Sequence, residues 1–299
     1  ALLQVMEQIK RIGPFRLPTL IHGESGVGKE LIAKALHQHS EHASEPFVAI
    51  NCAAISPELF ESELFGHERG SFTGADSKRV GLCGAAGTGT LFLDEIGDLP
   101  SVLQPKLLRL LEQRTYRPVG SDRERPFLAR VVAATHIDLE ASVRKNQFRQ
   151  DLYFRLSAQE VFVPPLRERK EDIQLLSLHF IDRYNEQCGR NVEGLLPQAL
   201  NLLMEHDWTQ NNIRELEREI QRAMVRADGV KMIGPGHLFW KKGVQVFPKE
   251  RKHQLETLRA EEQHENAQTA AASPQRSVND MKLIKALEEK VVQLELQLT

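Results

Sequence analysis

Residues 23–29 read Gly23-Glu24-Ser25-Gly26-Val27-Gly28-Lys29, which fits the G-x-x-x-x-G-K part of the nucleotide-binding P-loop. Before this stretch, residues 18–22 form a short, largely apolar run that predicts a buried strand. After it, apolar residues recur at helical spacing from Leu31 to Leu36, so we expect a helix that begins near Lys29. Glycines let backbone N–H groups converge on phosphate oxygens, and a helix N-terminus favours negative charge. We expect the Lys29 ammonium to bind β- and γ-phosphates; the alternative is a tight strand-to-helix turn without a ligand.

The composition is typical of a soluble globular protein. Hydrophobic residues make up 41% of the chain and charged residues 27%, and a net charge of −2 gives no electrostatic footprint for nucleic acid. The sequence shows no membrane-spanning run and no signal peptide, so we expect a cytoplasmic protein without membrane contact. Cys52, Cys83 and Cys188 form no C-x-x-C pair, which predicts buried thiols in a reducing cytosol. Because the chain begins inside an apolar helical stripe, we expect it to begin partway through a longer protein.

Further apolar runs predict strands that alternate with helices. The predicted strands are residues 46–51, 90–95, 130–135 and 161–163, and the helices between and before them are 2–9, 57–66, 103–113 and 139–145. Ser56 and Pro57 are typical of the N-cap and first position of a helix. This alternation predicts an α/β sandwich with a mostly parallel sheet.

Two carboxylates follow the most apolar of these runs. Asp94 and Glu95 end the run 90–95, and ligands of open α/β sheets bind beyond the carboxyl ends of strands. An isolated Asp-Glu pair is usually a solvated turn, but behind a P-loop one acid can bind Mg²⁺ and the other can polarise water. Glu30 stands where the general P-loop has a Ser or Thr ligand for Mg²⁺.

An aromatic residue lies between glycines in the stretch Gly70-Ser71-Phe72-Thr73-Gly74-Ala75. One interpretation is an exposed, mobile contact loop. The other is an ordinary loop whose Phe72 folds back onto the surface.

From Asp172 the pattern is wholly helical and predicts a small all-helical domain. Residues 241–280 predict a flexible linker. Residues 281–299 predict an amphipathic helix, either a weak dimer helix or one that lies on the body of the protein. His37, His39 and His42 indicate a solvated helix end rather than a metal site.

Taken together, these motifs resemble the central AAA+ domain of the bacterial enhancer-binding proteins, which activate sigma-54 RNA polymerase. The resemblance covers about residues 1–228 and implies a nucleotide-binding subdomain over 1–166 and a helical lid over 167–240. Glu30 in the P-loop is the family's own variant. The 70–75 loop is similar to the loop that contacts sigma-54 in this family, usually written with Ala where Ser71 stands. Residues 90–95 resemble the Walker B strand.

The resemblance also implies roles for single residues. Asn51 matches the asparagine that senses the γ-phosphate and restrains the catalytic Glu. Thr135 falls at the sensor I position, where its neighbour His136 replaces a usual Asn. Arg149 and Arg155 match two arginines placed in trans at the subunit interface.

Arg214 matches the arginine of the sensor II helix. The preceding residues 208–211 lack the family's Pro-Gly, and this stretch is one residue longer than the family pattern.

The function implied by the resemblance is ATP hydrolysis with Mg²⁺, in a homo-oligomer expected to be a hexamer. Hydrolysis would move the 70–75 loop and remodel the sigma-54 holoenzyme so that the promoter opens. The alternative is a nucleotide-gated binding module or repressor, which the changes at His136 and before Arg214 permit but the intact Lys29, Asp94 and Glu95 oppose. No helix-turn-helix pattern follows Trp240, so specific DNA contact would need segments outside this chain.

Overall fold

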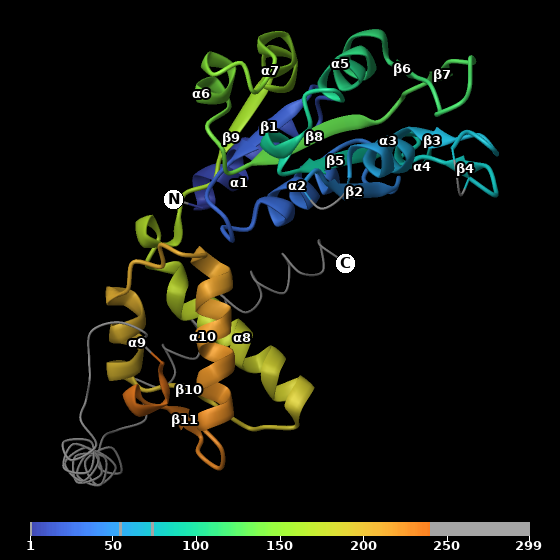
Figure 1. Ribbon diagram of the computed structural model, residues 1–299. Coiled ribbons are helices and arrows are strands. Elements are labelled where there is room, and N and C mark those ends of the chain that lie inside the picture. The colour runs from blue at the N-terminus through green and yellow to red at the C-terminus, as the bar shows by residue number, and fades with distance from the viewer. Residues whose placement is uncertain (1, 54–55, 73–74, 240–299) are drawn as a thin grey trace, which may run out of the picture. The chain divides into compact units, whose positions relative to one another are not determined.

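The computed structural model describes residues 2–53, 56–72 and 75–239 (Figure 1). Contacts divide this part of the chain into two units. The first holds the residues up to Phe180 together with Leu200–Arg218, and the second holds Ile181–Ala199 together with the described residues from Glu219 onward. The glycine-rich loop and both carboxylates therefore lie in the first unit.

The first unit is built on a five-stranded sheet. Its strands are β1 (Thr19–His22), β2 (Phe47–Asn51), β5 (Thr90–Asp94), β8 (Arg130–Thr135) and β9 (Gln159–Phe162), in the order β2-β5-β8-β1-β9. Every neighbouring pair is parallel, which confirms the predicted α/β sandwich. Because parallel strands end at the same edge of a sheet, the residues that follow β1, β5 and β8 come together there.

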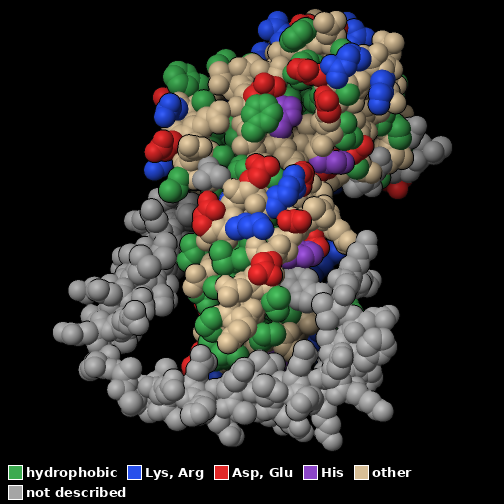
Figure 2. All heavy atoms as spheres, turned by 90° about the vertical axis from the view of Figure 1, so that its left-hand side faces the viewer, with side chains coloured by type: hydrophobic (Ala, Val, Ile, Leu, Met, Phe, Trp, Pro, Cys, Tyr) green, Lys and Arg blue, Asp and Glu red, His purple; other side chains and the backbone are tan. Residues whose placement is uncertain are grey.

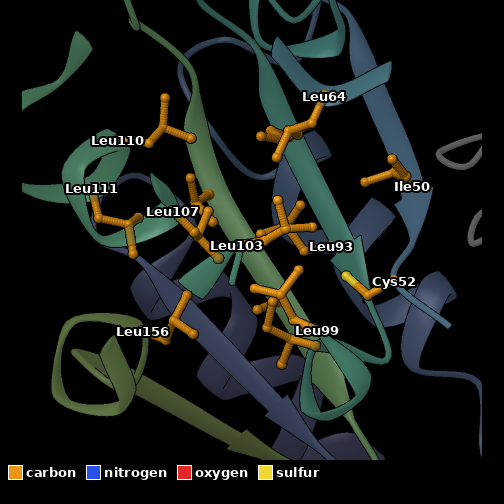
Figure 3. Close-up of a cluster of buried hydrophobic side chains, with 14 of the residues drawn as sticks. Ile50, Cys52, Leu64, Leu93, Leu99, Leu103, Leu107, Leu110, Leu111 and Leu156 are labelled. Carbon is orange, nitrogen blue, oxygen red and sulfur yellow. The ribbon is translucent and has the colours of Figure 1, made fainter. Parts of the chain in front are cut away.

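Helices cover both faces of this sheet (Figure 1). The helices α1 (Leu2–Ile12) and α2 (Lys29–Gln38) share one apolar cluster with the sheet. On the other face, a second cluster, part of which Figure 3 shows, joins the sheet to α3 (Pro57–Phe65), α4 (Leu82–Ala85), α5 (Gln104–Gln113) and α7 (Gln150–Leu156). Leu91 and Leu93 belong to the second cluster and Phe92 to the first. Burial on both faces explains why this strand is apolar without alternation.

Local capping sets the beginning of two helices. The Ser56 hydroxyl accepts a hydrogen bond from the Leu59 N–H at 3.4 Å, and α3 begins at Pro57 as predicted. Asp138 caps α6 (Leu139–Arg144) by accepting from the Ala141 N–H at 2.9 Å. These bonds satisfy N–H groups that have no partner inside the helix.

Two short antiparallel pairs were not expected from the sequence. They are β3 (Gly66–His67) with β4 (Arg79–Val80), and β6 (Thr115–Tyr116) with β7 (Arg125–Pro126). Strands of two residues are too short to show a period-two pattern. The first pair flanks the 70–75 loop and joins its two ends. The unit also contains the 3-10 turns η1 (Ile96–Asp98) and η2 (Leu166–Glu168).

The three apolar stripes predicted after Asp172 correspond to helices α8 (Asp172–Cys188), α9 (Pro197–Glu205) and α10 (Asn212–Arg226). The expectation that this region is wholly helical is corrected. The strand β10 (Gly194–Leu195) pairs in parallel with β11 (Met232–Ile233), and the 3-10 turn η3 (Pro235–His237) follows. Pairs this short leave no periodicity in the sequence.

The expectation of a solvated helix end is corrected for His37, whereas His39 and His42 are partly exposed. His37 is only 6% exposed, and its Nδ1 lies 3.0 Å from the Thr90 Oγ1 on β5. Burial lowers the pKa of His37, because the charged imidazolium is poorly solvated there. Among the described residues, no group of three or more His, Cys, Asp or Glu side chains could hold a metal ion.

Cys52 and Cys83 are buried, as expected, whereas Cys188 is exposed. No helix in the described part of the chain is both long and apolar enough to cross a membrane. On the face shown in Figure 2, Lys and Arg side chains are interspersed with Asp and Glu, in keeping with the net charge of −2. The predicted linker 241–280 and helix 281–299 lie outside the described residues.

Candidate functional site

The strands β1, β2, β5 and β8 bring their polar ends together at one edge of the sheet. Parallel pairing sets Asn51 opposite Asp94, and His22 opposite Thr135. The Gly23 N–H, the first of the glycine-rich loop, donates to the Thr135 carbonyl at 3.3 Å. The first residue of the loop therefore lies beside the last residue of β8.

The glycine-rich loop depends on glycine at two positions. Gly26 has φ 76° and Gly28 has φ 100°, in the left-handed region that other residues rarely adopt. The side chain of Lys29, 6% exposed, lies beneath this loop. Its Nζ donates to the carbonyls of Gly23 at 3.0 Å and Glu24 at 3.3 Å. The Lys29 ammonium is therefore hydrogen-bonded to the same loop that is expected to bind the phosphates.

The Glu95 carboxylate meets that ammonium. Its Oε1 lies 3.3 Å from the Lys29 Nζ, although the two residues come from different strand-to-helix connections. Its Oε2 accepts from the His136 backbone N–H at 3.2 Å and lies 2.6 Å from the His136 Nδ1. Glu95 itself has φ 52°, so the chain leaves the strand conformation at this residue and turns the side chain toward β8. Burial favours a higher pKa for Glu95, but His136 and Lys29 outweigh it and the pKa is lowered.

Asp94 has different partners. Its Oδ2 accepts from the Asn51 Nδ2 at 3.3 Å, and its Oδ1 accepts from the Glu95 N–H at 3.1 Å. Burial and the adjacent Glu95 charge raise the pKa of Asp94, which means that this site favours a cation or a proton. Hard oxygen donors of this kind suit Mg²⁺, which takes one or two carboxylates together with substrate phosphates. Glu30 pairs instead with Lys34 at 3.1 Å on the solvent side of α2.

Arg167 and Asn212 both bind Glu24 in the glycine-rich loop, and the sequence did not predict these contacts. The Arg167 guanidinium binds both carboxylate oxygens of Glu24, at 2.7 and 2.9 Å. Asn212, 1% exposed, donates to Glu24 at 3.1 Å and to the Ser25 carbonyl at 3.0 Å, and accepts from the Leu166 N–H at 2.8 Å. The bidentate pair with Arg167 is the largest cause of the lowered pKa of Glu24. Nothing in the sequence around Arg167 signals this pair, because its partner lies 143 residues away.

The beginning of α10 lies against the same loop. The Ile213 N–H donates to the Gly26 carbonyl at 3.0 Å, and the Ser25 hydroxyl lies 3.3 Å from the Asn211 Oδ1. A Cβ at Gly26 would clash with the Asn211 carbonyl. The stretch that is one residue longer than the family pattern therefore contacts the loop directly, and Arg214 follows on the exposed side of the helix.

The 70–75 loop is held at its base. Phe72 is 43% exposed, and its ring meets the His67 ring edge-on at 5.0 Å. The His67 Nδ1 lies 2.8 Å from the Ser62 hydroxyl. The ring rests on the surface, as the second interpretation expects, while much of it faces solvent; the contact role of the loop stays a prediction. Ser71 has no hydrogen-bond partner for its hydroxyl among the described residues. Thr73 and Gly74 lie outside the described residues.

The two arginines expected in trans have partners within the chain. Arg149 makes a bidentate pair with Asp151, at 3.0 and 2.7 Å, and this hydrogen bonding raises the pKa of Arg149. Arg155 on α7 lies 3.4 Å from Glu112. Both side chains are about half exposed, so a neighbouring molecule can reach them.

The profile of the family described as "Sigma-54 interaction domain" matches residues 1–162, more than half of the chain. The chain belongs to the sigma-54 interaction domain family. A second profile, described as "AAA+ ATPase lid domain", matches residues 167–269.

Bacterial transcriptional regulators are among the relatives of this chain. It is 48% identical over 229 residues to the transcriptional regulatory protein ZraR of Escherichia coli K12, covering 77% of this chain and 52% of ZraR. It is 48% identical over 233 residues to the transcriptional regulator VasH of Vibrio cholerae, covering 78% of this chain and 44% of VasH. The chain spans about half the length of the curated relatives it matches.

The fold of this chain is similar to that of a solved bacterial protein, NtrX. NtrX from Brucella abortus matches with a TM-score of 0.76 at 33% identity, covering 86% of this chain and 59% of NtrX. NtrX has also been solved in complex with ADP and with ATP. The fold class predicted from the sequence, an AAA+ α/β sandwich followed by a helical region, is confirmed.

Proposed function

We propose that this chain binds and hydrolyses ATP and uses the cycle to remodel a sigma-54 RNA polymerase holoenzyme so that promoter DNA opens. The observation that carries the proposal is the approach of the Lys29 ammonium to the Glu95 carboxylate, at 3.3 Å, beside the glycine-rich loop. A phosphate-binding cation and a water-polarising residue are two of the protein groups that promote phosphoryl transfer to water. The ATP complex of NtrX, a relative of the same fold, supports the choice of nucleotide.

Different residues around the glycine-rich loop would bind the phosphates, hold Mg²⁺ and polarise the attacking water. Backbone N–H groups of residues 23–30 would surround the phosphates, and Lys29 would exchange its carbonyl partners for phosphate oxygens. Asp94 would hold Mg²⁺, which neutralises charge on the phosphates when it is bound. Glu95 would polarise the attacking water, and Asn51 and Thr135 would sense the γ-phosphate from neighbouring strand ends.

The same proposal assigns the two subdomains. Residues 1–166 would form the nucleotide-binding subdomain and residues 167–240 the helical lid, with Arg214 sensing the nucleotide from the first turn of α10. The backbone bond between Ile213 and Gly26 supports this role, because it ties the start of that helix to the phosphate-binding loop.

Partner contacts complete the proposal. The loop of residues 70–75 would contact sigma-54, and its half-exposed Phe72 offers an apolar side chain for that purpose. Arg149 and Arg155 would reach the nucleotide of a neighbouring copy in a homo-oligomer, most simply a hexamer. An arginine supplied in trans stabilises charge that develops on the transferred phosphoryl group.

Two measurements test the proposal. The first is steady-state release of phosphate from ATP by the wild type and by Glu95→Gln, with nucleotide affinity measured separately; wild-type turnover in Glu95→Gln would contradict the site. The second is open-complex formation at a sigma-54 promoter with Phe72→Ala, which we expect to hydrolyse ATP and fail to open DNA. Phe15→Ala is the matched control, because Phe15 is another exposed aromatic residue at 61% and lies outside the loop. Equal promoter opening by both variants would refute the role of the loop.

Hydrolysis without any effect on sigma-54 holoenzyme would separate the two halves of the proposal. It would leave an ATPase site and exclude remodelling of this target. Nucleotide binding without hydrolysis by the wild type would reject the enzymatic half.

A further inference from the structure

The partner of Glu95 differs from the partner that the family resemblance implies. Asn51, expected to restrain the catalytic carboxylate, donates to Asp94 instead. The Glu95 Oε2 is bound by His136, through both the imidazole Nδ1 at 2.6 Å and the backbone N–H at 3.2 Å.

Sheet geometry accounts for this pairing. The strands β5 and β8 are neighbours, with Leu93 opposite Ala133, so the residues that follow them leave the sheet side by side. Glu95 has a left-handed conformation, φ 52° and ψ 51°, and its carboxylate reaches His136, the residue after β8. His136 is the third residue after the end of that register, directly after β8, and receives the carboxylate there.

The His136 ring has space to release this contact. Its side chain is 45% exposed and lines a cavity of about 340 Å³ together with His22, Thr135, Tyr153 and Glu160. Rotation of the ring into that space would free the Glu95 Oε2 from its shorter bond. The contact is therefore reversible without rearrangement of the sheet.

We propose that His136 is a positioning residue that restrains Glu95 in a resting orientation, a task that Asn51 does not perform in this chain. This inference rests on the proposed ATPase function. In hydrolysis the water oxygen bonds to the γ-phosphorus as the bond from that phosphorus to the bridging oxygen of ADP breaks, and Glu95 accepts a proton from the water. A carboxylate whose two oxygens already accept hydrogen bonds is a poor acceptor for that proton.

The restraint persists when ATP binds. Lys29 then turns to the phosphates and frees the Glu95 Oε1, whereas His136 still holds the Oε2. Hydrolysis would wait until the imidazole releases the carboxylate, so that His136 governs kcat rather than KM.

The kinetic test compares His136→Ala with His136→Asn. Loss of the imidazole donor in His136→Ala is expected to raise kcat about three- to tenfold with KM changed less than about twofold, as for the loss of one hydrogen bond of ordinary net strength. The Asn Nδ2 occupies the same branch position as the His Nδ1, so His136→Asn restores the donor and brings kcat back toward the wild-type value. His42→Ala, a histidine beyond the end of α2, controls for the general loss of an imidazole. An unchanged or lower kcat in His136→Ala, or no recovery in His136→Asn, overturns the restraint.

The second test needs no nucleotide. In the full chain with ring-¹⁵N histidine, the His136 resonances, assigned by their loss in His136→Asn, are expected to show a protonated Nδ1, because an ionised carboxylate only accepts hydrogen bonds. Glu95→Ala should remove that preference, and a spectrum that Glu95→Ala leaves unchanged overturns the contact. If the wild type hydrolyses no ATP, the proposed function fails while the spectrum still decides the contact. If the wild type hydrolyses ATP and His136→Ala matches it, the inference alone fails.

Discussion

Replacing Asn212 with alanine is expected to lower the free energy of unfolding by about 3 kcal/mol. The Asn212 side chain is 1% exposed and joins three backbone segments at the glycine-rich loop. Its Oδ1 accepts from the buried N–H of Leu166 at 2.8 Å, and its Nδ2 donates to Glu24 and to the Ser25 carbonyl. Asn212 also has φ 48°, a left-handed conformation that asparagine tolerates better than alanine.

The magnitude comes from two separate terms. Leaving the Leu166 N–H buried without a partner costs about 1–3 kcal/mol. Placing alanine in the left-handed conformation adds about 1 kcal/mol. For a domain of this size, 1 kcal/mol corresponds to about 2–4 °C in Tm, so the combined loss is about 6–12 °C.

Calorimetric melting of three variants separates these terms. Asn212→Gly removes the same hydrogen bonds but accepts φ 48°, so it should melt about 2–4 °C above Asn212→Ala. Asn201→Ala, an exposed asparagine on α9, is the control and should change Tm by less than about 2 °C. The reasoning is refuted if Asn212→Ala melts within 2 °C of the wild type, about one-third of the smallest loss expected. A glycine variant less stable than the alanine variant would refute the backbone term alone.

Three further predictions concern the nucleotide site. Lys29→Ala should abolish binding of a fluorescent ATP analogue, whereas Glu95→Gln should bind it and turn ATP over about 10²–10⁴-fold more slowly. Arg149→Ala should bind ATP and hydrolyse it poorly, and mixing it with Lys29→Ala should restore turnover, because intact composite sites form between unlike copies. A co-assembled mixture without activity would contradict the role in trans. The pKa of Glu24 is depressed below its ordinary value of 4.5 by hydrogen bonding to Arg167, so its stabilisation is complete above that pH and lost as the pH falls below it. Arg167→Leu should flatten this acid loss of Tm, and an equally steep loss in the variant would show that Arg167 does not cause it.

The sequence predicted the sheet because its information there is local. The run 90–94 is apolar throughout, since its residues alternate between two buried faces, and such a run identifies a central parallel strand. The α3 boundary was equally accessible, because Ser56 and Pro57 act on N–H groups within one helical turn. The glycines of residues 23–29 likewise report their own backbone conformation.

Contacts between distant segments were not accessible in the same way. Nothing in the pattern around Arg167 indicates that it binds Glu24, 143 residues away in the chain. His37 looked like part of a solvated cluster because its neighbours are polar, yet the hydroxyl of Thr90 lets it be buried. A polar residue can be placed inside or outside only once its partner is known, and the partner belongs to another strand or helix.

Sequence motifs identified the residues of the site but did not correctly predict which of them bind one another. Motif matching identified Asn51, Asp94, Glu95 and His136 as neighbours of the phosphates, and the structure brings all four to one edge of the sheet. It predicted that Asn51 would hold Glu95, whereas the register of β2 and β5 sets Asn51 opposite Asp94. Glu95 lies one residue beyond that register, where the left-handed turn directs its carboxylate to the opposite neighbour, β8. The identity of the residue after β8 therefore decides what holds the carboxylate, and in this chain that residue is an imidazole that can donate a hydrogen bond to it.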